Sequence, residues 1–186
     1  RAANYYGSVN SAYYAASASA SKWVLDNWSK AAVGPSGYMA TWYTDNAVNA
    51  LFSIAASGTD ANSLVGMSNM YTRSIYVECS YLKGAGADDV HDIYEADDIR
   101  YTSQGMIGME GGYLSMLGKW PSMDFSDNNI VIRVEEMHLI YAEASLRAGD
   151  TATAKTYLNN VQAARGASLT DATLDNIILE RRREFF

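Results

Sequence analysis

The chain has 186 residues, a net charge of −7 and an isoelectric point near 4.7. This acidic balance opposes nucleic-acid binding, because no basic surface would neutralise the phosphates. The single cysteine, Cys79, excludes an intrachain disulfide and a zinc site of several thiolates. No apolar run approaches the roughly 20 residues of a transmembrane helix, and the 48% apolar content suffices for one domain over residues 1–186.

The first predicted element is a helix over residues 5–28. Its apolar residues recur at helical steps and are expected to share one packed face, made of Val9, Tyr13, Ala16, Ala20, Trp23 and Val24. We assign Trp23 and Trp28 to structural packing. Residues 34–37 form a turn. The apolar run at 47–56 is interpreted as extended, although periodicity alone does not separate a strand from a buried helical turn.

Residues 57–126 are rich in Gly, Ser, Asn and Asp, which predicts long irregular connections. Such loops often carry function, so a binding surface is expected there. Aromatic rings in or beside these loops can cover the CH faces of a sugar while polar groups bind its hydroxyls. The candidates for ligand contact are Trp42, Tyr43, Tyr71, Arg73 and Trp120. Packing in the core remains the alternative for each tryptophan.

The clearest pattern is a helical hairpin at residues 131–165. A helix over 131–148 ends at Gly149, which tolerates a left-handed conformation, and Asp150 or Thr151 caps the next helix over 152–165. The short connection makes the two helices antiparallel, and Leu158 lies on the packed face of the second. This arrangement is typical of a tetratricopeptide-like repeat.

A third helix is predicted over residues 172–185, with Leu174, Ile177, Ile178, Phe185 and Phe186 opposite a charged face that contains Glu180, Arg181, Arg182 and Arg183. Together these elements predict a mainly α fold of tetratricopeptide-like hairpins with long irregular loops.

No motif predicts catalysis, a metal or a cofactor. Gly84-Ala85-Gly86 lacks the third glycine of a dinucleotide-binding loop. Glu135 and His138 have the spacing of a metal-ligand pair, but a di-iron bundle needs a second pair, so we expect His138 to face solvent or to bond a carbonyl. The acidic pairs at 88–89 and 97–98 are interpreted as solvated charges or turn formers rather than glycosidase carboxylates.

Several motifs in the last third occur in an order that resembles the SusD/RagB family. They are Arg133, Glu136, Leu139, Ala142-Glu143-Ala144, Gly149-Asp150 and Glu180-Arg181-Arg182-Arg183-Glu184-Phe185. Asp97-Asp98-Ile99-Arg100 is similar to the Asp-x-Arg element of that family. From the same resemblance we expect the chain to be a fragment of a longer protein.

The resemblance implies a non-catalytic protein that binds a glycan or another nutrient. It further implies a lipid anchor on the extracellular face of the outer membrane and delivery of the ligand to a SusC-like TonB-dependent transporter. A helical repeat module that binds a protein partner is the alternative. A hydrolase with an unrecognised site is a third.

Two acidic residues of the hairpin require partners if they lie near its packed face. Glu136 and Glu143 are expected to pair with Arg133, with an arginine of 181–183, or with backbone NH groups, because a buried carboxylate must be matched by donors. We hypothesise a contact between Glu143 and one of the arginines at 181–183. The structural residues predicted for this part of the chain are Arg133, Glu136, Glu143, Gly149 and Leu158.

Overall fold

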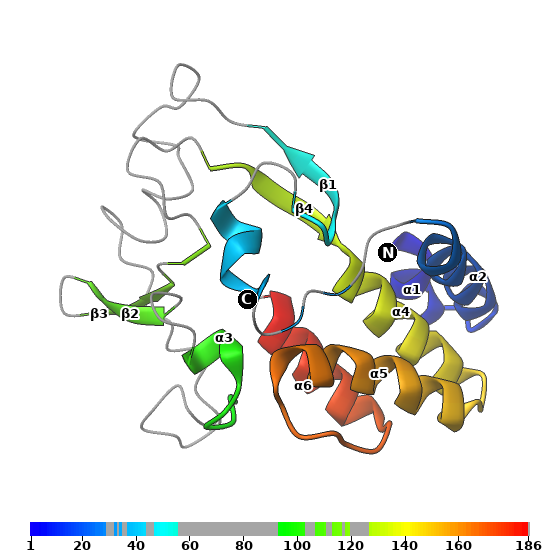
Figure 1. The fold of residues 1–186 in the computed structure, drawn as a ribbon. Coiled ribbons are helices and arrows are strands. Elements are labelled where there is room, and N and C mark those ends of the chain that lie inside the picture. Colours follow the sequence, from blue (N-terminus) through cyan, green and yellow to red (C-terminus); the bar gives the residue numbers. More distant parts are fainter. Residues whose placement is uncertain are drawn as a thin grey trace.

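The computed structural model describes residues 1–28, 32, 34, 37–43, 47–55, 93–102, 107–110, 113–116, 118–119 and 127–185 (Figure 1). Its fold is mainly α-helical with tetratricopeptide-like hairpins, as predicted. Helices α4 (Val134–Arg147), α5 (Thr151–Arg165) and α6 (Leu174–Phe185) lie side by side, and α1 (Ala2–Gly7) and α2 (Ala12–Asn27) pack at the outer side of α4 (Figure 1).

The predicted hairpin consists of α4 (Val134–Arg147) and α5 (Thr151–Arg165). Gly149 has φ of 87°, and the side chain of Asp150 accepts a hydrogen bond of 3.0 Å from the backbone NH of Thr153, so the predicted stop and cap are both confirmed. The hairpin core contains Leu139, Ala142, Leu158, Val161 and, from α6, Ile177.

Helix α6 (Leu174–Phe185) matches the predicted range, but its exposed and buried faces differ from the prediction. Ile177 is buried as expected, whereas Ile178 and Phe185 are exposed. Glu180 and Glu184 are 0% and 2% exposed, although Glu180 was predicted to lie on a solvated face. Arginines from other elements supply the partners that make this burial possible.

Two helices replace the single helix predicted over residues 5–28: α1 (Ala2–Gly7) and α2 (Ala12–Asn27). The chain reverses between them, and the ring of Tyr14 lies so close to Gly7 that an added Cβ would be 2.5 Å from it. The side chain of Asn10 accepts a hydrogen bond from the NH of Ala12 at 3.1 Å, which stabilises the turn before α2.

The predicted packed face of α2 is wrong. Tyr14, Ser17 and Ser21 are its buried residues. The Ser21 hydroxyl donates to the Ser17 carbonyl at 2.7 Å, and the Ser17 hydroxyl donates to the side chain of Asn4 at 3.3 Å. Small hydroxyl residues with satisfied hydrogen bonds therefore occupy the side of α2 that packs in the fold.

Trp23 and Trp28 were assigned to structural packing, and this assignment is also wrong, because 60% and 46% of their surfaces are exposed.

A two-stranded antiparallel sheet joins β1 (Ala50–Ile54) to β4 (Asn129–Arg133). The extended interpretation of 47–56 is confirmed over β1. The helix predicted from residue 131 begins instead at Val134, because the β-branched run before it pairs with β1. The NH of Val134 bonds to the carbonyl of Asn49 at 2.9 Å, which fixes the start of α4 beside the sheet.

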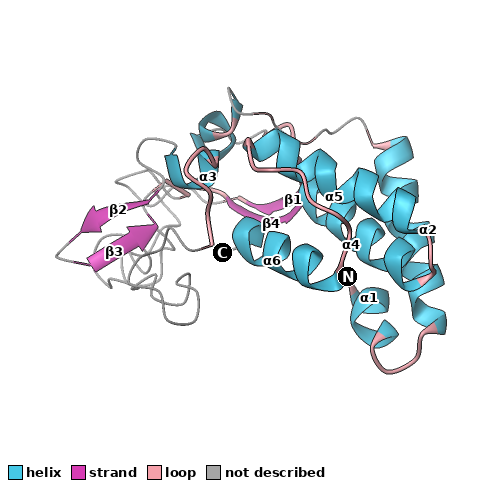
Figure 2. Cartoon of the chain, turned by 90° about the horizontal axis from the view of Figure 1, so that it is seen from below, coloured by secondary structure: helices cyan, strands magenta, loops and turns pink. Residues whose placement is uncertain are grey.

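The described parts of the segment 57–126 are not wholly irregular, contrary to prediction. They contain the short helix α3 (Ile99–Thr102) and the hairpin of β2 (Ile107–Glu110) and β3 (Tyr113–Met116). Seen from below, β2 and β3 lie at the opposite end of the molecule from α1 and α2 (Figure 2).

Within the described ranges, no helix is both long enough and apolar enough to span a bilayer.

The substitution Leu158→Ala is expected to lower the free energy of unfolding by about 2–5 kcal/mol, because it leaves a cavity among α4, α5 and α6. Leu158 is fully buried in the hairpin core. Leu169→Ala is the matched control: Leu169 is exposed, so its loss should stay within about 0.5 kcal/mol. Urea denaturation of both variants measures the difference, and equal losses would contradict the packing of the hairpin.

Candidate functional site

A buried ion cluster lies where α3, β4, α4, α5 and α6 meet. Its members are Asp98, Arg100, Arg133, Glu135, Arg165, Glu180 and Glu184, and each is less than 9% exposed. Because burying an unpaired charge is costly, the geometry of the pairing decides whether this junction is stable.

The first part of the buried ion cluster is the Asp98-x-Arg100 motif. The Asp98 side chain accepts from the backbone NH of Arg100 at 2.9 Å and from Nη2 of the same residue at 2.6 Å. Asp98 is completely buried, which corrects its interpretation as a solvated acid. On its other side, Arg100 Nη1 lies 2.6 Å from Glu180 Oε1 and 3.2 Å from Glu184 Oε2. The motif thus connects α3 to α6.

Glu184 is the centre of the buried ion cluster, because three guanidinium groups converge on it. Arg133 Nη1 donates to Oε1 at 2.7 Å, and Arg165 Nε donates to Oε2 at 2.9 Å. Arg165 also binds Glu135 at 2.7 Å, and Asn49 donates to the same carboxylate at 2.9 Å. Burial alone would raise the pKa of Glu184, but Arg165, Arg133 and Arg100 together hold it well below its ordinary value.

Glu180 is held less completely than Glu184. Its Oε1 accepts from Arg100, but its Oε2 has no hydrogen-bond partner within the described part of the chain, and Arg183 Nη1 is 3.7 Å away. Desolvation raises the pKa of Glu180, although Arg100 acts in the opposite direction. Four carboxyl groups thus share three guanidinium groups in this cluster, and the pKa of Glu180 is raised where that of Glu184 is lowered.

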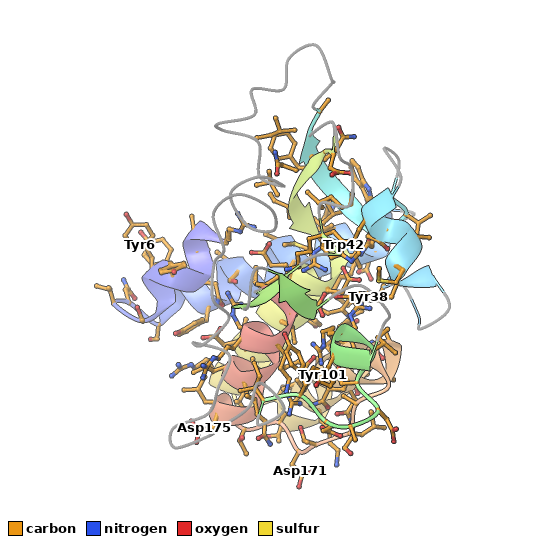
Figure 3. All side chains as sticks on the ribbon, turned by 90° about the vertical axis from the view of Figure 1, so that its left-hand side faces the viewer. Tyr6, Tyr38, Trp42, Tyr101, Asp171 and Asp175 are labelled. Atoms are coloured by element: carbon orange, nitrogen blue, oxygen red, sulfur yellow. The ribbon has the colours of Figure 1, made fainter. Side chains whose placement is uncertain are left out.

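An aromatic patch, made of Tyr38, Trp42, Tyr94 and Tyr101, contacts the arginines of the buried ion cluster. Tyr38, Trp42 and Tyr101 are labelled in Figure 3. The guanidinium of Arg165 lies 4.7 Å from the centre of the Tyr38 ring, and that of Arg100 lies 5.7 Å from the Tyr94 ring. Tyr38 and Tyr94 are buried, whereas Trp42 and Tyr101 are half-buried. The patch therefore has a fixed base and two rings that reach the surface.

Cations contact the ring of Trp42, which belongs to the 3₁₀ helix η2 (Met39–Tyr43). Arg133 lies 5.0 Å from the ring centre and Lys119 lies 5.4 Å from it. Arg133 is also 5.5 Å from the ring of Phe185 at the end of α6. Trp42 and the end of α6 are thus both attached to Arg133, which is itself held by Glu184.

The candidates for ligand contact fall into two groups. Trp42 lies in the aromatic patch, and Tyr43 follows it at the end of η2. Tyr71, Arg73 and Trp120 lie outside the described residues. Tyr38 and Tyr101 were not predicted.

The structural candidates occupy defined positions as well. Glu136 accepts two hydrogen bonds from Arg1, at 2.5 and 2.6 Å, rather than from Arg133 or the arginines of α6. Glu143 accepts from Asn4 at 2.8 Å and lies 3.9 Å from Arg181 Nη1, which is the kind of contact hypothesised for it. Both glutamates therefore link α4 to the N-terminal helix.

His138 is half-buried, and its Nδ1 does not bond a carbonyl of any described residue. That atom is buried and has no hydrogen-bond partner in the described ranges, and the ring lies 5.5 Å from the ring of Tyr157. Burial lowers the pKa of His138. Among the described residues, no group of three or more His, Cys, Asp or Glu side chains is arranged to hold a metal ion.

Comparison with known proteins identifies a family. The model of the SusD family matches residues 22–186. No curated protein sequence shows significant similarity to the chain.

Solved structures share this fold. A SusD homolog from Bacteroides thetaiotaomicron superposes with a TM-score of 0.69 at 18% identity, covering 98% of this chain and 45% of the other. A SusD superfamily protein from the same organism gives 0.67 at 20% identity, covering 93% and 47%. A SusD-like carbohydrate binding protein from Bacteroides vulgatus gives 0.65 at 21% identity, covering 91% and 38%. The chain spans less than half the length of each.

Replacement of Arg165 by Met is expected to lower the free energy of unfolding by about 3–5 kcal/mol, because it leaves Glu184 and Glu135 buried without their shared donor. Lys155→Met is the control, since Lys155 pairs with Asp171 at the exposed surface and its loss should cost about 0.2–1 kcal/mol. Chemical denaturation at neutral pH compares the two variants. Similar losses would show that the buried ion cluster contributes no more than a surface pair.

Stability should depend on pH with two opposite slopes. Glu184 has a lowered pKa in the folded state, so its stabilisation is complete above the unfolded value of about 4.3 and is lost as the pH falls further. Glu180 has a raised pKa, so the folded state binds its proton first and stability increases slightly as the pH falls from neutral towards about 4.3. Thermal melts from pH 8 to 3 measure both slopes. Glu180→Gln should abolish only the shallow increase, and an unchanged profile in that variant would refute this assignment.

Proposed function

The chain belongs to the SusD family, and from this premise we propose that it is a non-catalytic binding protein for a glycan or a similar hydroxyl-rich nutrient. The match over residues 22–186 is the observation that carries the proposal. A sugar-binding role also agrees with the aromatic patch, where rings with fixed positions lie near the surface.

Trp42 and Tyr101 are the proposed contacts. Sugars have apolar CH faces that stack on aromatic rings, and a few polar groups then fix their orientation. Both rings pack on buried residues of the patch: Trp42 meets Tyr38 edge-on at 6.2 Å, and Tyr101 stacks on Tyr94 at 6.4 Å. Rings held in this way lose little conformational freedom when a ligand binds, which favours affinity.

The carboxyl groups beneath the patch support binding rather than glycoside hydrolysis. A glycosidase places two carboxyl groups on either side of the scissile bond. Asp98, Glu180 and Glu184 are instead buried and bound to arginines, so a sugar on the patch does not reach them. Their role in this proposal is to position the rings.

The cellular setting is proposed from family membership. The protein would act at the extracellular face of the outer membrane, lipid-anchored in its full-length form, and deliver its ligand to a SusC-like TonB-dependent transporter. Co-purification of the full-length protein with an outer-membrane transporter from its native host tests this part. The alternative, a helical module for a protein partner, draws support from the exposed aromatic side chains of α1 and α2.

Trp42→Ala is expected to weaken binding of the best oligosaccharide about 5–10-fold, because a lost aromatic contact is worth roughly 0.5–1.5 kcal/mol beyond its buried area. Calorimetry against a panel of oligosaccharides first identifies that ligand with the unmodified chain. Tyr101→Ala is a second variant, which removes another ring of the aromatic patch and leaves the contacts of Arg133 in place.

Trp23→Ala is the matched control, since Trp23 is exposed on α2, away from the patch. It should bind with unchanged affinity, and melting temperatures of all three variants establish that they are folded. Unchanged affinity in both Trp42→Ala and Tyr101→Ala would place the ligand elsewhere, and failure of the whole panel to bind would contradict glycan binding by this chain.

A further inference from the structure

The helix α2 has an exposed apolar stripe that the packing of the fold leaves uncovered. We call Tyr13, Ala16, Ala20 and Trp23 the α2 stripe; all four are exposed and follow one another at helical steps of three or four. Tyr6 of α1 extends the stripe, because its ring lies 5.8 Å from that of Tyr13, and it points away from the fold (Figure 3). Val9, between the two helices, is 84% exposed.

This surface has the pattern of a helix interface. A helical layer buries an apolar stripe against the next layer, and α2 is already packed against α4 through a different side, which contains Ser17 and Ser21. Ala16 and Ala20 are small residues at the centre of the stripe, which permits close approach of two helix backbones, and the bulky rings of Tyr13 and Trp23 lie at its ends. An isolated surface aromatic needs no such explanation, but a continuous stripe does.

The charge distribution favours a second copy of the chain as the occupant. Arg1, Lys22 and Asp26 are the only charged residues among 1–28, so this part has a net charge of +1 while the remaining residues carry −8. Two acidic molecules that meet through α1 and α2 keep their acidic parts apart.

The stripe is also self-complementary. Around a two-fold axis near Ala18, an antiparallel copy places Ala16 of one chain opposite Ala20 of the other and Tyr13 opposite Trp23, as an isologous interface requires. From this symmetry, the exposure and the charge distribution, we infer that two copies of this chain associate through antiparallel packing of their α2 stripes.

The expected dimer is weak. Since an aromatic side chain buries about 150–250 Å², the exposed fractions of Tyr6, Tyr13 and Trp23, which are 61%, 47% and 60%, correspond to roughly 350 Å² per copy. With Val9 and the alanines, two copies reach about 1,000 Å², where specific interfaces begin. Association is therefore expected in the micromolar range.

Sedimentation equilibrium over a range of micromolar concentrations tests the inference. The mass should rise from 20.3 kDa towards twice that value as concentration increases. Ala16→Glu and Ala20→Glu should each remain monomeric with an unchanged circular dichroism spectrum, since both residues are exposed. Ala163→Glu on α5, also exposed, should dimerise like the unmodified chain. A monomer at every concentration, or dimerisation of the Ala16→Glu variant, would overturn the inference.

Cross-linking tests the orientation. In a Cys79→Ser background, Ala16→Cys and Ala20→Cys variants should cross-link at least several-fold faster when mixed than when either is alone, because only the antiparallel pairing brings residue 16 to residue 20. Faster cross-linking of each variant with itself would indicate a parallel pair and refute the arrangement. If the chain is monomeric and Trp23→Ala weakens binding of a neutral oligosaccharide, the stripe is a sugar-binding surface and the dimer is rejected. The outcome is independent of whether the aromatic patch binds a glycan.

Discussion

Burial of the Glu184 carboxylate is the constraint on which the central junction depends. A lone carboxylate in this position would be expelled to solvent or protonated, and only the convergence of Arg100, Arg133 and Arg165 keeps it charged. Those three arginines come from α3, β4 and α5, so a single side chain of α6 fixes the relative positions of four elements. Ion clusters of this kind are more demanding in geometry than an apolar core, because every donor must be placed before the charge is tolerated.

The same cluster positions the proposed binding surface. Arg165 lies against the ring of Tyr38, Arg100 against Tyr94 and Arg133 against Trp42, so each arginine contacts at least one carboxylate and at least one ring. The rings pack on apolar residues such as Ile93, Ile99 and Leu179 as well as on the guanidinium groups. The same three guanidinium groups thus hold the junction together and support the rings of the proposed binding surface.

The sequence allowed good prediction where local chemistry decides the structure. The end of α4 and the start of α5 follow from Gly149 and Asp150, whose roles depend on neighbouring residues. The packed face of α2 could not be read in this way, because alanine and serine fill most of that helix and either side can pack.

Glu180 and Glu184 were missed for another reason: a charged run is normally solvated, and the arginines that bury these two residues lie far away in the sequence. The sequence offered one signal: Glu180 and Glu184 are four residues apart, so both lie on the same side of one helix. The Asp98-x-Arg100 motif was the second part of that signal. Trp42 was identified as a candidate from its position beside loops, but its support by Arg133 depends on tertiary contacts that the sequence does not display.

The position of Glu184 along the chain determines the order in which the fold can close. Its partners precede it by 84, 51 and 19 residues, so a ribosome has released all three arginines before the carboxylate that neutralises them emerges. The α4–α5 hairpin is local and can assemble early, whereas the junction must wait for the last helix and for loop closures over long stretches of chain. Arg100 and Arg165 can meet Asp98 and Glu135 earlier in synthesis, but the Glu184 carboxylate that joins all three arginines takes its place only when α6 docks.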